Sequence, residues 1–303
     1  MSSASVKKTF RWRIIQPYLF ISPFFILYAV FGIYPLLSGF DTAMHLSGEY
    51  VGFQNFGTVI HDELFWKALQ NAFLYMLGSI FIILPVAMLA ALAMSSKLLS
   101  RGRGLITTVY FIPNVTSVIV IGIVFKLLLK TQNGTINTLL MALGLIQKPM
   151  KWLSDPSLAI PSLIMLGTWR FFGINSLYFL SGLQGIPNDL LDAARIDGCR
   201  SWSEFWYIKL PLLKPIMTYV VFTAIIGSFS ITGEVYSLVG IGGTGTKYSF
   251  LFPVVYLYNT MFRDGKMNQA TAMGYVLALV LLVLTIIQRR VFAERDGQRR
   301  ARV

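Results

Sequence analysis

Long apolar segments are the feature that most limits what this 303-residue chain can fold into. A helix needs about 20 apolar residues to cross the hydrocarbon core of a bilayer, because each residue advances it by only about 1.5 Å. Only 13% of the residues are charged, too few to cover a soluble domain of this length. The sequence therefore predicts an all-α integral membrane protein with six transmembrane helices, at about 17–40, 70–95, 105–129, 158–183, 213–234 and 270–290.

The start of the chain favours a first transmembrane helix over a cleavable signal peptide. Four basic residues at positions 7–13 precede the apolar segment 17–40. That segment is longer than the apolar part of a signal peptide, and no small-x-small cleavage site follows it.

The distribution of basic residues predicts the orientation in the membrane. Seventeen Lys and Arg residues fall in segments 7–13, 97–103, 195–214 and 289–302, and eight fall in the segments on the other side. Cytoplasmic loops carry the excess of Lys and Arg, so both termini and the 195–214 segment are predicted to be cytoplasmic. The net charge of +13 is therefore a topology signal, since a nucleic-acid surface would need one clustered basic face.

Metal, disulfide and nucleotide sites are not indicated. Cys199 is the single cysteine, and His45 and His61 are isolated from any cluster with metal-ligand spacing. Residues 240–245 fit the dinucleotide pattern G-x-G-x-x-G, but they follow an apolar segment with no βαβ unit around them. Lys247 lacks the Gly-Lys-Ser/Thr adjacency of a Walker A motif. A partner subunit or an ion gradient is therefore expected to supply the energy for any work that the protein does.

The interruption between the fourth and fifth apolar segments carries helix signals of its own. It runs from 187 to 215 as PNDLLDAARIDGCRSWSEFWYIKLPLLKP. Gly198 is placed to end a first short helix in the left-handed conformation. Ser201 and Glu204 have the spacing of a capping box, which predicts the start of a second helix.

The second predicted helix carries three aromatic residues on one face. Trp202, Phe205 and Trp206 are spaced i, i+3, i+4. Pro211 is expected to end this helix, and Pro215 to lie in the first turn of the next one.

The same interruption resembles the signature loop of bacterial ABC-importer permeases. That signature reads Glu-Ala-Ala, three residues, Gly, nine residues, Ile-x-Leu-Pro. The chain has Asp192-Ala193-Ala194, three residues, Gly198, nine residues, then Ile208-x-Leu210-Pro211, so Asp192 replaces the glutamate but keeps its charge. The segments 34–36, 50–56 and 65–73 also resemble the binding-protein-dependent sugar permeases, in the branch of maltose-type and glycerol-phosphate-type first permeases.

This resemblance implies a coupling helix that docks in a groove of a cytoplasmic ATPase subunit. The aromatic face is expected to fill that groove, and Asp192 and Arg195 to make polar contacts around it. The expected ATPase-coupling residues are Asp192, Ala193, Ala194, Arg195, Gly198, Trp202, Phe205, Trp206, Ile208 and Pro211.

The resemblance also implies an assembly in the bacterial cytoplasmic membrane. The expected partners are a second, similar permease in a heterodimer, two ATPase subunits that bind ATP and Mg, an extracytoplasmic solute-binding protein and a carbohydrate substrate. The chain itself is expected to be neither an enzyme nor a cofactor protein, and to work by alternating access. Its expected divisions are 1–68 (basic segment, first helix and outer loop), 69–290 (permease core) and 291–303 (basic cytoplasmic tail).

A substrate path is indicated by the one basic residue inside an apolar segment. Arg170 is costly in mid-membrane unless it faces a cavity, and helical spacing places Gly167, Phe171 and Ile174 on its side. Trp169 and Tyr178 are candidates to border that cavity. Candidates on the helix after the signature loop are Ser228, Ser230, Thr232 and, near its outer end, Glu234.

The role of Arg170 stays open between two interpretations. In a path it would suit hydroxyl-rich or anionic sugars through forked hydrogen bonds. Alternatively, it hydrogen-bonds backbone carbonyls or extends to the membrane surface. Asn114, beside Pro113, is a weaker path candidate, because a hydrogen bond between packed helices would also explain it.

Two other function classes compete with the importer subunit. An ion-coupled secondary sugar transporter commonly keeps an acidic residue in mid-membrane, whereas Asp41 and Glu234 fall near predicted helix ends. A structural or signalling membrane subunit needs no path at all. Stimulation of a partner ATPase by a sugar-loaded binding protein would separate the three, and no nucleophile–base arrangement suggests a membrane enzyme.

Overall fold

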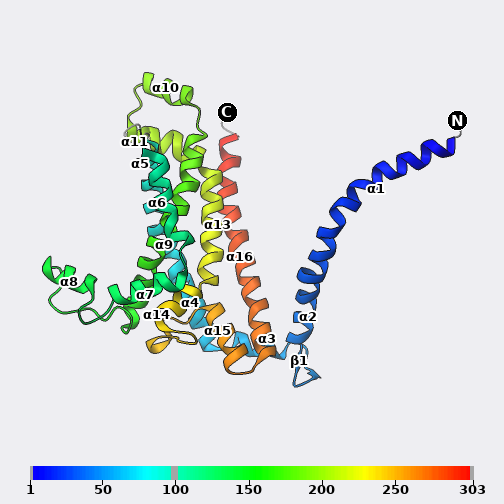
Figure 1. The fold of residues 1–303 in the computed structure, drawn as a ribbon, viewed down its shortest axis with the longest axis horizontal. Coiled ribbons are helices and arrows are strands. Elements are labelled where there is room, and N and C mark those ends of the chain that lie inside the picture. Colours follow the sequence, from blue (N-terminus) through cyan, green and yellow to red (C-terminus); the bar gives the residue numbers. More distant parts are fainter. Residues whose placement is uncertain (1–2, 97–101, 301–303) are drawn as a thin grey trace.

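The structure is a computed structural model that describes the backbone of residues 3–96 and 102–300. Side chains are described for residues 16–96 and 104–292, so the predicted basic residues at 7–13, 97–103 and 295–302 lie outside the described side chains. Figure 1 shows an elongated helical bundle with two ends, which α10 (Asn188–Ile196) and α3 (Gln54–Ile60) mark. The start of α1 and the end of the last helix lie toward the α10 end.

Membrane-length helices make up most of the fold. Among the described residues, four helices are long and apolar enough to cross a membrane, and two bent pairs bring the number to six if each pair crosses once. The unbroken spans are Gln16–Ala43, Glu63–Ser95, Pro156–Gln184 and Met267–Phe292. The predicted helical membrane fold is confirmed, apart from a hairpin of two short strands, β1 (His45–Leu46) and β2 (Glu49–Tyr50).

The first span stands apart from the rest of the bundle. It consists of α1 (Ser3–Tyr28), the π-turn η1 (Ala29–Ile33) and α2 (Tyr34–Ala43). Its most apolar window is 0% buried, and Figure 1 shows it leaving the bundle from its α2 end. There the Tyr275 hydroxyl donates to the Leu36 carbonyl, which ties α2 to the last helix.

The second span is one helix in three parts: α4 (Glu63–Gly78), the π-turn η2 (Ser79–Ile83) and α5 (Leu84–Ser95). It begins seven residues before the predicted start at 70, because the Asp62 side chain caps it by accepting the Leu64 N–H at 2.9 Å. Asp62 also accepts the Tyr256 hydroxyl at 2.6 Å, which joins this helix start to the segment around Tyr256.

The predicted third helix is broken rather than straight. It consists of α6 (Arg103–Val115) and α7 (Val118–Leu128), whose axes differ by 92°. Thr116 and Ser117 take extended backbone angles between them, three residues after Pro113. The prediction of one continuous helix over 105–129 is therefore wrong.

The fourth span lies at the centre of the bundle. A small outer arm with α8 (Thr135–Ala142) leads to α9 (Pro156–Gln184), which packs along α5 and α6. Asp155 caps α9 by accepting the Ser157 N–H at 2.9 Å and its hydroxyl at 2.7 Å. These two hydrogen bonds hold the pKa of the Asp155 carboxyl below its ordinary value, so the cap stays charged.

The signature loop folds into short helical pieces. It contains α10 (Asn188–Ile196), α11 (Ser201–Glu204), the π-turn η4 (Phe205–Lys209) and α12 (Leu210–Leu212). A bend of 69° then leads into α13 (Lys214–Ser230), with Pro215 in its first turn as predicted.

Two details of the loop differ from the predictions. The helix runs one residue past Pro211, to Leu212. The predicted capping box is wrong: the N-cap position is Arg200, which makes no side-chain capping bond. Glu204 does not reach back to the helix start, because Arg195 and Lys209 bind its carboxylate.

The predicted fifth helix also ends early. Extended backbone at Ile231 stops α13 at Ser230, so Glu234 belongs to a separate helix, α14 (Gly233–Val239). The chain then passes through η5 (Thr246–Tyr248), α15 (Pro253–Tyr258) and the π-turn η6 (Asn259–Arg263) to α16 (Met267–Arg300).

Asn71 on α4 fastens the glycine-rich segment that follows α14. Its side-chain amide donates to the carbonyls of Tyr248 and Leu251, both at 2.9 Å, and the residue is 2% exposed. These bonds hold a segment in which Lys247 and Tyr248 both have left-handed backbone angles.

We expect Asn71→Ala to loosen this segment, since two carbonyls would lose their donor at a cost of about 1–3 kcal/mol. Limited trypsin digestion in detergent should cut after Lys247 several-fold faster than in wild type. Gln70→Ala, an exposed neighbour on the same helix, is the matched control. Equal cutting rates for wild type and Asn71→Ala would contradict the anchoring role.

Candidate functional site

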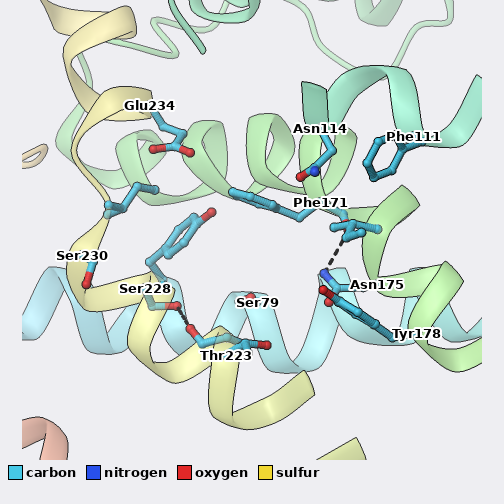
Figure 2. A pocket seen from close by; sticks show the side chains of 15 residues that line it. Ser79, Phe111, Asn114, Phe171, Asn175, Tyr178, Thr223, Ser228, Ser230 and Glu234 are labelled. Carbon is cyan, nitrogen blue, oxygen red and sulfur yellow. Dashed lines mark hydrogen bonds between the residues drawn. The ribbon is translucent and has the colours of Figure 1, made fainter. Parts of the chain in front are cut away.

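A cavity of about 530 Å³ lies among four of the membrane helices. Its walls come from α4 and η2, from α6, from α9, and from α13 with the break that follows it. Figure 2 shows Glu234 toward one end of the cavity and Tyr178 toward the other. The lining residues are Tyr75, Ser79, Phe111, Asn114, Phe171, Ile174, Asn175, Tyr178, Thr223, Ala224, Gly227, Ser228, Ser230, Ile231 and Glu234.

Most polar groups of this lining are uncharged hydroxyls and amides. Ser228 donates to the Ala224 carbonyl at 2.7 Å, and the Asn175 amide donates to the Phe171 carbonyl at 2.9 Å (Figure 2). Each side chain thus donates one hydrogen bond within its own helix, while the side-chain oxygens keep lone pairs for other donors. Aromatic rings of Phe111, Phe171 and Tyr178 supply much of the apolar surface.

Arg170 forms a salt bridge with Glu234. The guanidinium Nη1 donates to the Glu234 carboxylate, and the two side chains are 20% and 9% exposed. The guanidinium carbon also lies 5.1 Å from the centre of the Phe171 ring, within cation–π range. The salt bridge connects the middle of α9 to α14, so the predicted mid-membrane charge has a partner 64 positions away.

The cavity-facing side of α9 differs from the predicted one. Phe171 and Ile174 line the cavity as predicted, together with Asn175 and Tyr178. Arg170 and Gly167 do not line it. The lining residues of α9 therefore lie about one helical turn later in the chain than predicted from Arg170.

Gly167 instead makes room for a neighbouring helix. A Cβ at this position would lie 2.3 Å from the Tyr75 hydroxyl oxygen, so Gly167 allows α4 and α9 to approach closely. Trp169 lines a different, apolar hollow of about 670 Å³ between α5, α7 and α9. There its ring centre lies 5.9 Å from the centre of the Phe125 ring.

Three of the four predicted residues after the signature loop line the cavity. These are Ser228, Ser230 and Glu234, whereas Thr232 sits in the helix break and donates to the Ser230 carbonyl at 3.1 Å. Asn114 on α6 also lines the cavity.

Several lining residues were missed from the sequence. Tyr75 and Ser79 belong to a helix with no mid-membrane charge to draw attention to it, and Thr223 and Gly227 look like ordinary packing residues. Asn175 had a signal: it is an amide within an apolar segment, spaced i+4 from Phe171 and i−3 from Tyr178.

The signature loop forms a second site at the α10 end of the molecule. Figure 1 shows α10 beyond the ends of the membrane helices, and none of its residues is buried. Gly198 has a φ of +83° and ends α10 as predicted. Its N–H donates to the Arg195 carbonyl at 3.1 Å and the next N–H, of Cys199, to the Ala194 carbonyl at 2.9 Å, the paired bonds of a Schellman cap.

Charged side chains hold the two halves of the loop together. Arg195 binds Asp192 at 2.9 Å and Glu204 at 3.0 Å, and Lys209 binds the other Glu204 oxygen at 2.7 Å. The Glu204 side chain is only 5% exposed. These contacts fix α10 against the helix that carries the aromatic residues.

The three predicted aromatic residues cluster but do not share one exposed face. Trp202 and Trp206 are 73% and 47% exposed and their rings lie 5.7 Å apart. Phe205 instead packs against the buried cluster that includes Leu213 and Leu180. Tyr207 and Ile196, which the sequence did not single out, are among the most exposed large apolar residues. Ile208 and Pro211 are half-buried, and Asp192 and Ala193 are exposed.

Metal chemistry has no support in this geometry. Among residues 16–96 and 104–292, whose side chains the structure describes, no group of three or more His, Cys, Asp or Glu side chains is placed to hold a metal ion. A cavity of aromatic rings, hydroxyls and amides among membrane helices, together with a projecting loop at one end, is an arrangement typical of a membrane transport subunit.

The family of the chain follows from its similarity to known proteins. Residues 83–295 match the binding-protein-dependent transport system inner membrane component, and the chain belongs to this family of ABC-importer permeases. It is therefore a multi-pass permease subunit of a binding-protein-dependent ABC importer in the bacterial inner membrane, and the ATP is bound by partner ATPase subunits. The alternative of an ion-coupled secondary transporter is thereby excluded.

Individual relatives support the same assignment. The chain is 35% identical over 287 residues to the arabinooligosaccharides transport system permease protein AraP of Bacillus subtilis (strain 168), covering 93% of this chain and 90% of AraP. It is 32% identical over 300 residues to the lactose transport system permease protein LacF of Rhizobium radiobacter, covering 97% and 100%.

A solved structure shares the fold. A chain of the bacterial alginate ABC transporter, in complex with an alginate pentasaccharide-bound periplasmic protein, aligns with a TM-score of 0.80 at 23% identity. The alignment covers 93% of this chain and 98% of that chain.

Proposed function

We propose that this chain is the permease subunit that carries a sugar or oligosaccharide across the membrane in an ATP-driven importer. The observation that carries the proposal is the cavity lined with hydroxyls, amides and aromatic rings, in a chain whose relatives carry the names of oligosaccharide and lactose systems. Rings and neutral polar groups together suit the apolar faces and hydroxyl edges of a saccharide.

The proposed assembly is a heterodimer with a second permease, two ATPase subunits and the binding protein. The bare first span supports a second permease, because an apolar helix that is 0% buried within its own chain has a large surface left for a partner. The projecting loop supports an ATPase partner, with the exposed Trp202, Trp206, Tyr207 and Ile196 as contacts and the charged residues Asp192 and Arg195 beside them.

The proposed orientation places the loop and both termini in the cytoplasm. Support comes from the start of α1, the end of α16 and α10 lying toward the same end of the molecule, where the basic excess predicts the cytoplasm (Figure 1). The proposed divisions are the first helix with its outer loop at 1–68, the permease core at 69–290 and the basic tail at 291–303.

Transport would follow from two packings of the same helices. ATP binding closes the ATPase pair, and the loop transmits this movement to α13 through the bend at Leu213. The cavity is then exposed alternately to the two sides of the membrane.

Purification of the tagged chain in mild detergent, followed by mass spectrometry, tests the assembly. We expect a second permease and an ATPase to co-purify. In nanodiscs the ATPase rate should rise several-fold with the binding protein and its sugar over the binding protein alone. Recovery of this chain without an ATPase, under conditions in which it remains monodisperse, would contradict the proposal.

A further inference from the structure

We propose that the cavity selects uncharged saccharides and rejects acidic ones, because Glu234 presents a carboxylate to it and holds the Arg170 guanidinium outside the lining. This inference rests on the proposed function and adds to it the charge class of the substrate. The sequence-based expectation was that Arg170 would suit hydroxyl-rich or anionic sugars, and the inference keeps only the uncharged, hydroxyl-rich class.

The charge of the lining is the first argument. Among the described residues that line the cavity, Glu234 alone carries a formal charge, and Arg170 is not part of the lining. The guanidinium forms a salt bridge with the Glu234 carboxylate and a cation–π contact with the Phe171 ring. An acidic saccharide would therefore meet no unpaired cation in the cavity, and it would meet one carboxylate.

Burial makes this arrangement selective. The Glu234 side chain is 9% exposed and already paired with Arg170, so the salt bridge offers an acidic sugar no free cation, and little water surrounds it to screen a further negative charge. A sugar carboxylate in the cavity would also lose its own hydration without gaining a cationic partner, which is costly. A neutral sugar incurs neither penalty.

The rest of the lining fits neutral hydroxyl groups. Ser79, Asn114 and Ser230 place uncharged polar side chains on three different walls. Tyr75 also lines the cavity, and its buried hydroxyl has no hydrogen-bond partner among the described residues. That oxygen is inaccessible and lies beside Gly167, so Tyr75 contributes its ring rather than its hydroxyl to the lining.

Because of the salt bridge, a single substitution can change the charge beside the cavity from negative to positive. In Glu234→Gln the carboxylate is lost and Arg170 is left without its ionic partner. The cavity then gains an uncompensated positive charge at the position where the wild type holds a neutralised pair. The double variant Arg170→Gln with Glu234→Gln removes both charges and keeps the two side chains similar in size.

The experiment measures sugar binding to the complete importer in nanodiscs without ATP. The neutral probes are arabinotriose, maltotriose and α-1,4-galactotriose, and the acidic probe is trigalacturonate, which differs from galactotriose in the oxidation of C6. We expect the wild type to bind at least one neutral trisaccharide at least tenfold more tightly than trigalacturonate. Glu234→Gln should reduce this preference at least tenfold.

Two further variants separate charge from folding. The double variant removes the carboxylate without leaving an unpaired guanidinium, so it should not gain the acidic probe as Glu234→Gln does. Asp264→Asn, a change of an outer carboxylate that pairs with Arg263 away from the cavity, is the matched control and should behave like wild type.

The opposite results overturn the inference. Equal or tighter binding of trigalacturonate by the wild type would refute the charge selection, and so would an unchanged preference in a well-folded Glu234→Gln importer. If the wild type bound none of the probes, the cavity would not be the selective site. Stimulation of the ATPase by the sugar-loaded binding protein would in that case still support the proposed function.

Discussion

Gly198→Val is expected to release the ATPase from the permease. At a φ of +83° a valine suffers steric conflict between its branched side chain and its own backbone, at a cost of about 1–2 kcal/mol or more. The paired hydrogen bonds of Cys199 and Gly198 to the end of α10 depend on this conformation. The chain would therefore leave α10 in a different direction, and α10 would no longer meet the proposed ATPase partner in the same orientation.

The expected loss is large because the loop acts as one unit. Arg195 on α10 binds Glu204 on α11, so a changed exit at Gly198 also moves this contact. We expect co-purified ATPase to fall at least tenfold and sugar-stimulated ATP hydrolysis to disappear, as measured by quantitative mass spectrometry and by phosphate release.

Gly198→Asn is the matched control for side-chain volume. A Cβ at Gly198 would have nothing within 4 Å, so space does not limit this position and only the backbone conformation does. Asparagine tolerates the left-handed conformation far better than valine. It should retain most of the ATPase, and equal losses for Asn and Val would refute the conformational explanation.

The local features of this loop could be predicted from the sequence, and its ionic contacts could not. The glycine stop and the following helix are set by neighbouring residues, so the spacing in the sequence was enough. The capping box failed because Glu204 had a stronger partner: Arg195 lies nine positions before it, across the turn at Gly198. A four-residue sequence pattern carries no information about a partner that lies nine positions away.

Prediction of the cavity from the sequence was limited for the same reason, because its contacts join residues that are far apart in the chain. The sequence identified the right two helices and the unusual arginine, because a charge in an apolar segment is visible without any structure. It could not reveal that Glu234, 64 positions later, neutralises Arg170, since that contact depends on the break at Ile231 and Thr232. On α6, Asn114 was a weaker path candidate and does line the cavity, whereas Phe111 on α6 and the lining from α4 were missed because tertiary packing alone brings these ordinary hydroxyls and rings to the cavity.

Gly173→Ala is expected to destabilise the bundle, although alanine favours helices more than glycine does. Gly173 lies inside α9, and a Cβ there would stand 1.8 Å from the Tyr110 carbonyl oxygen of α6. The obstacle is backbone, so no side-chain rotation can remove it. The intrinsic helix preference gains at most about 1 kcal/mol, whereas overpacking of a tight contact costs about 1–3 kcal/mol or more.

The consequence reaches the cavity because α6 and α9 form two of its walls. Separation of these helices would shift Phe111 and Asn114 away from Phe171 and Asn175. We expect Gly173→Ala to lower the unfolding temperature of the detergent-purified importer and to weaken the binding of a neutral trisaccharide at least tenfold.

Gly227→Ala provides the matched comparison for stability. Gly227 also lies inside a membrane helix, α13, but a Cβ there would meet nothing within 4 Å. Its unfolding temperature should equal or exceed that of wild type, because only the helix preference changes. If Gly173→Ala were as stable as Gly227→Ala, α6 and α9 could not be packed through the Tyr110 carbonyl, and the shape assigned to the cavity would be wrong.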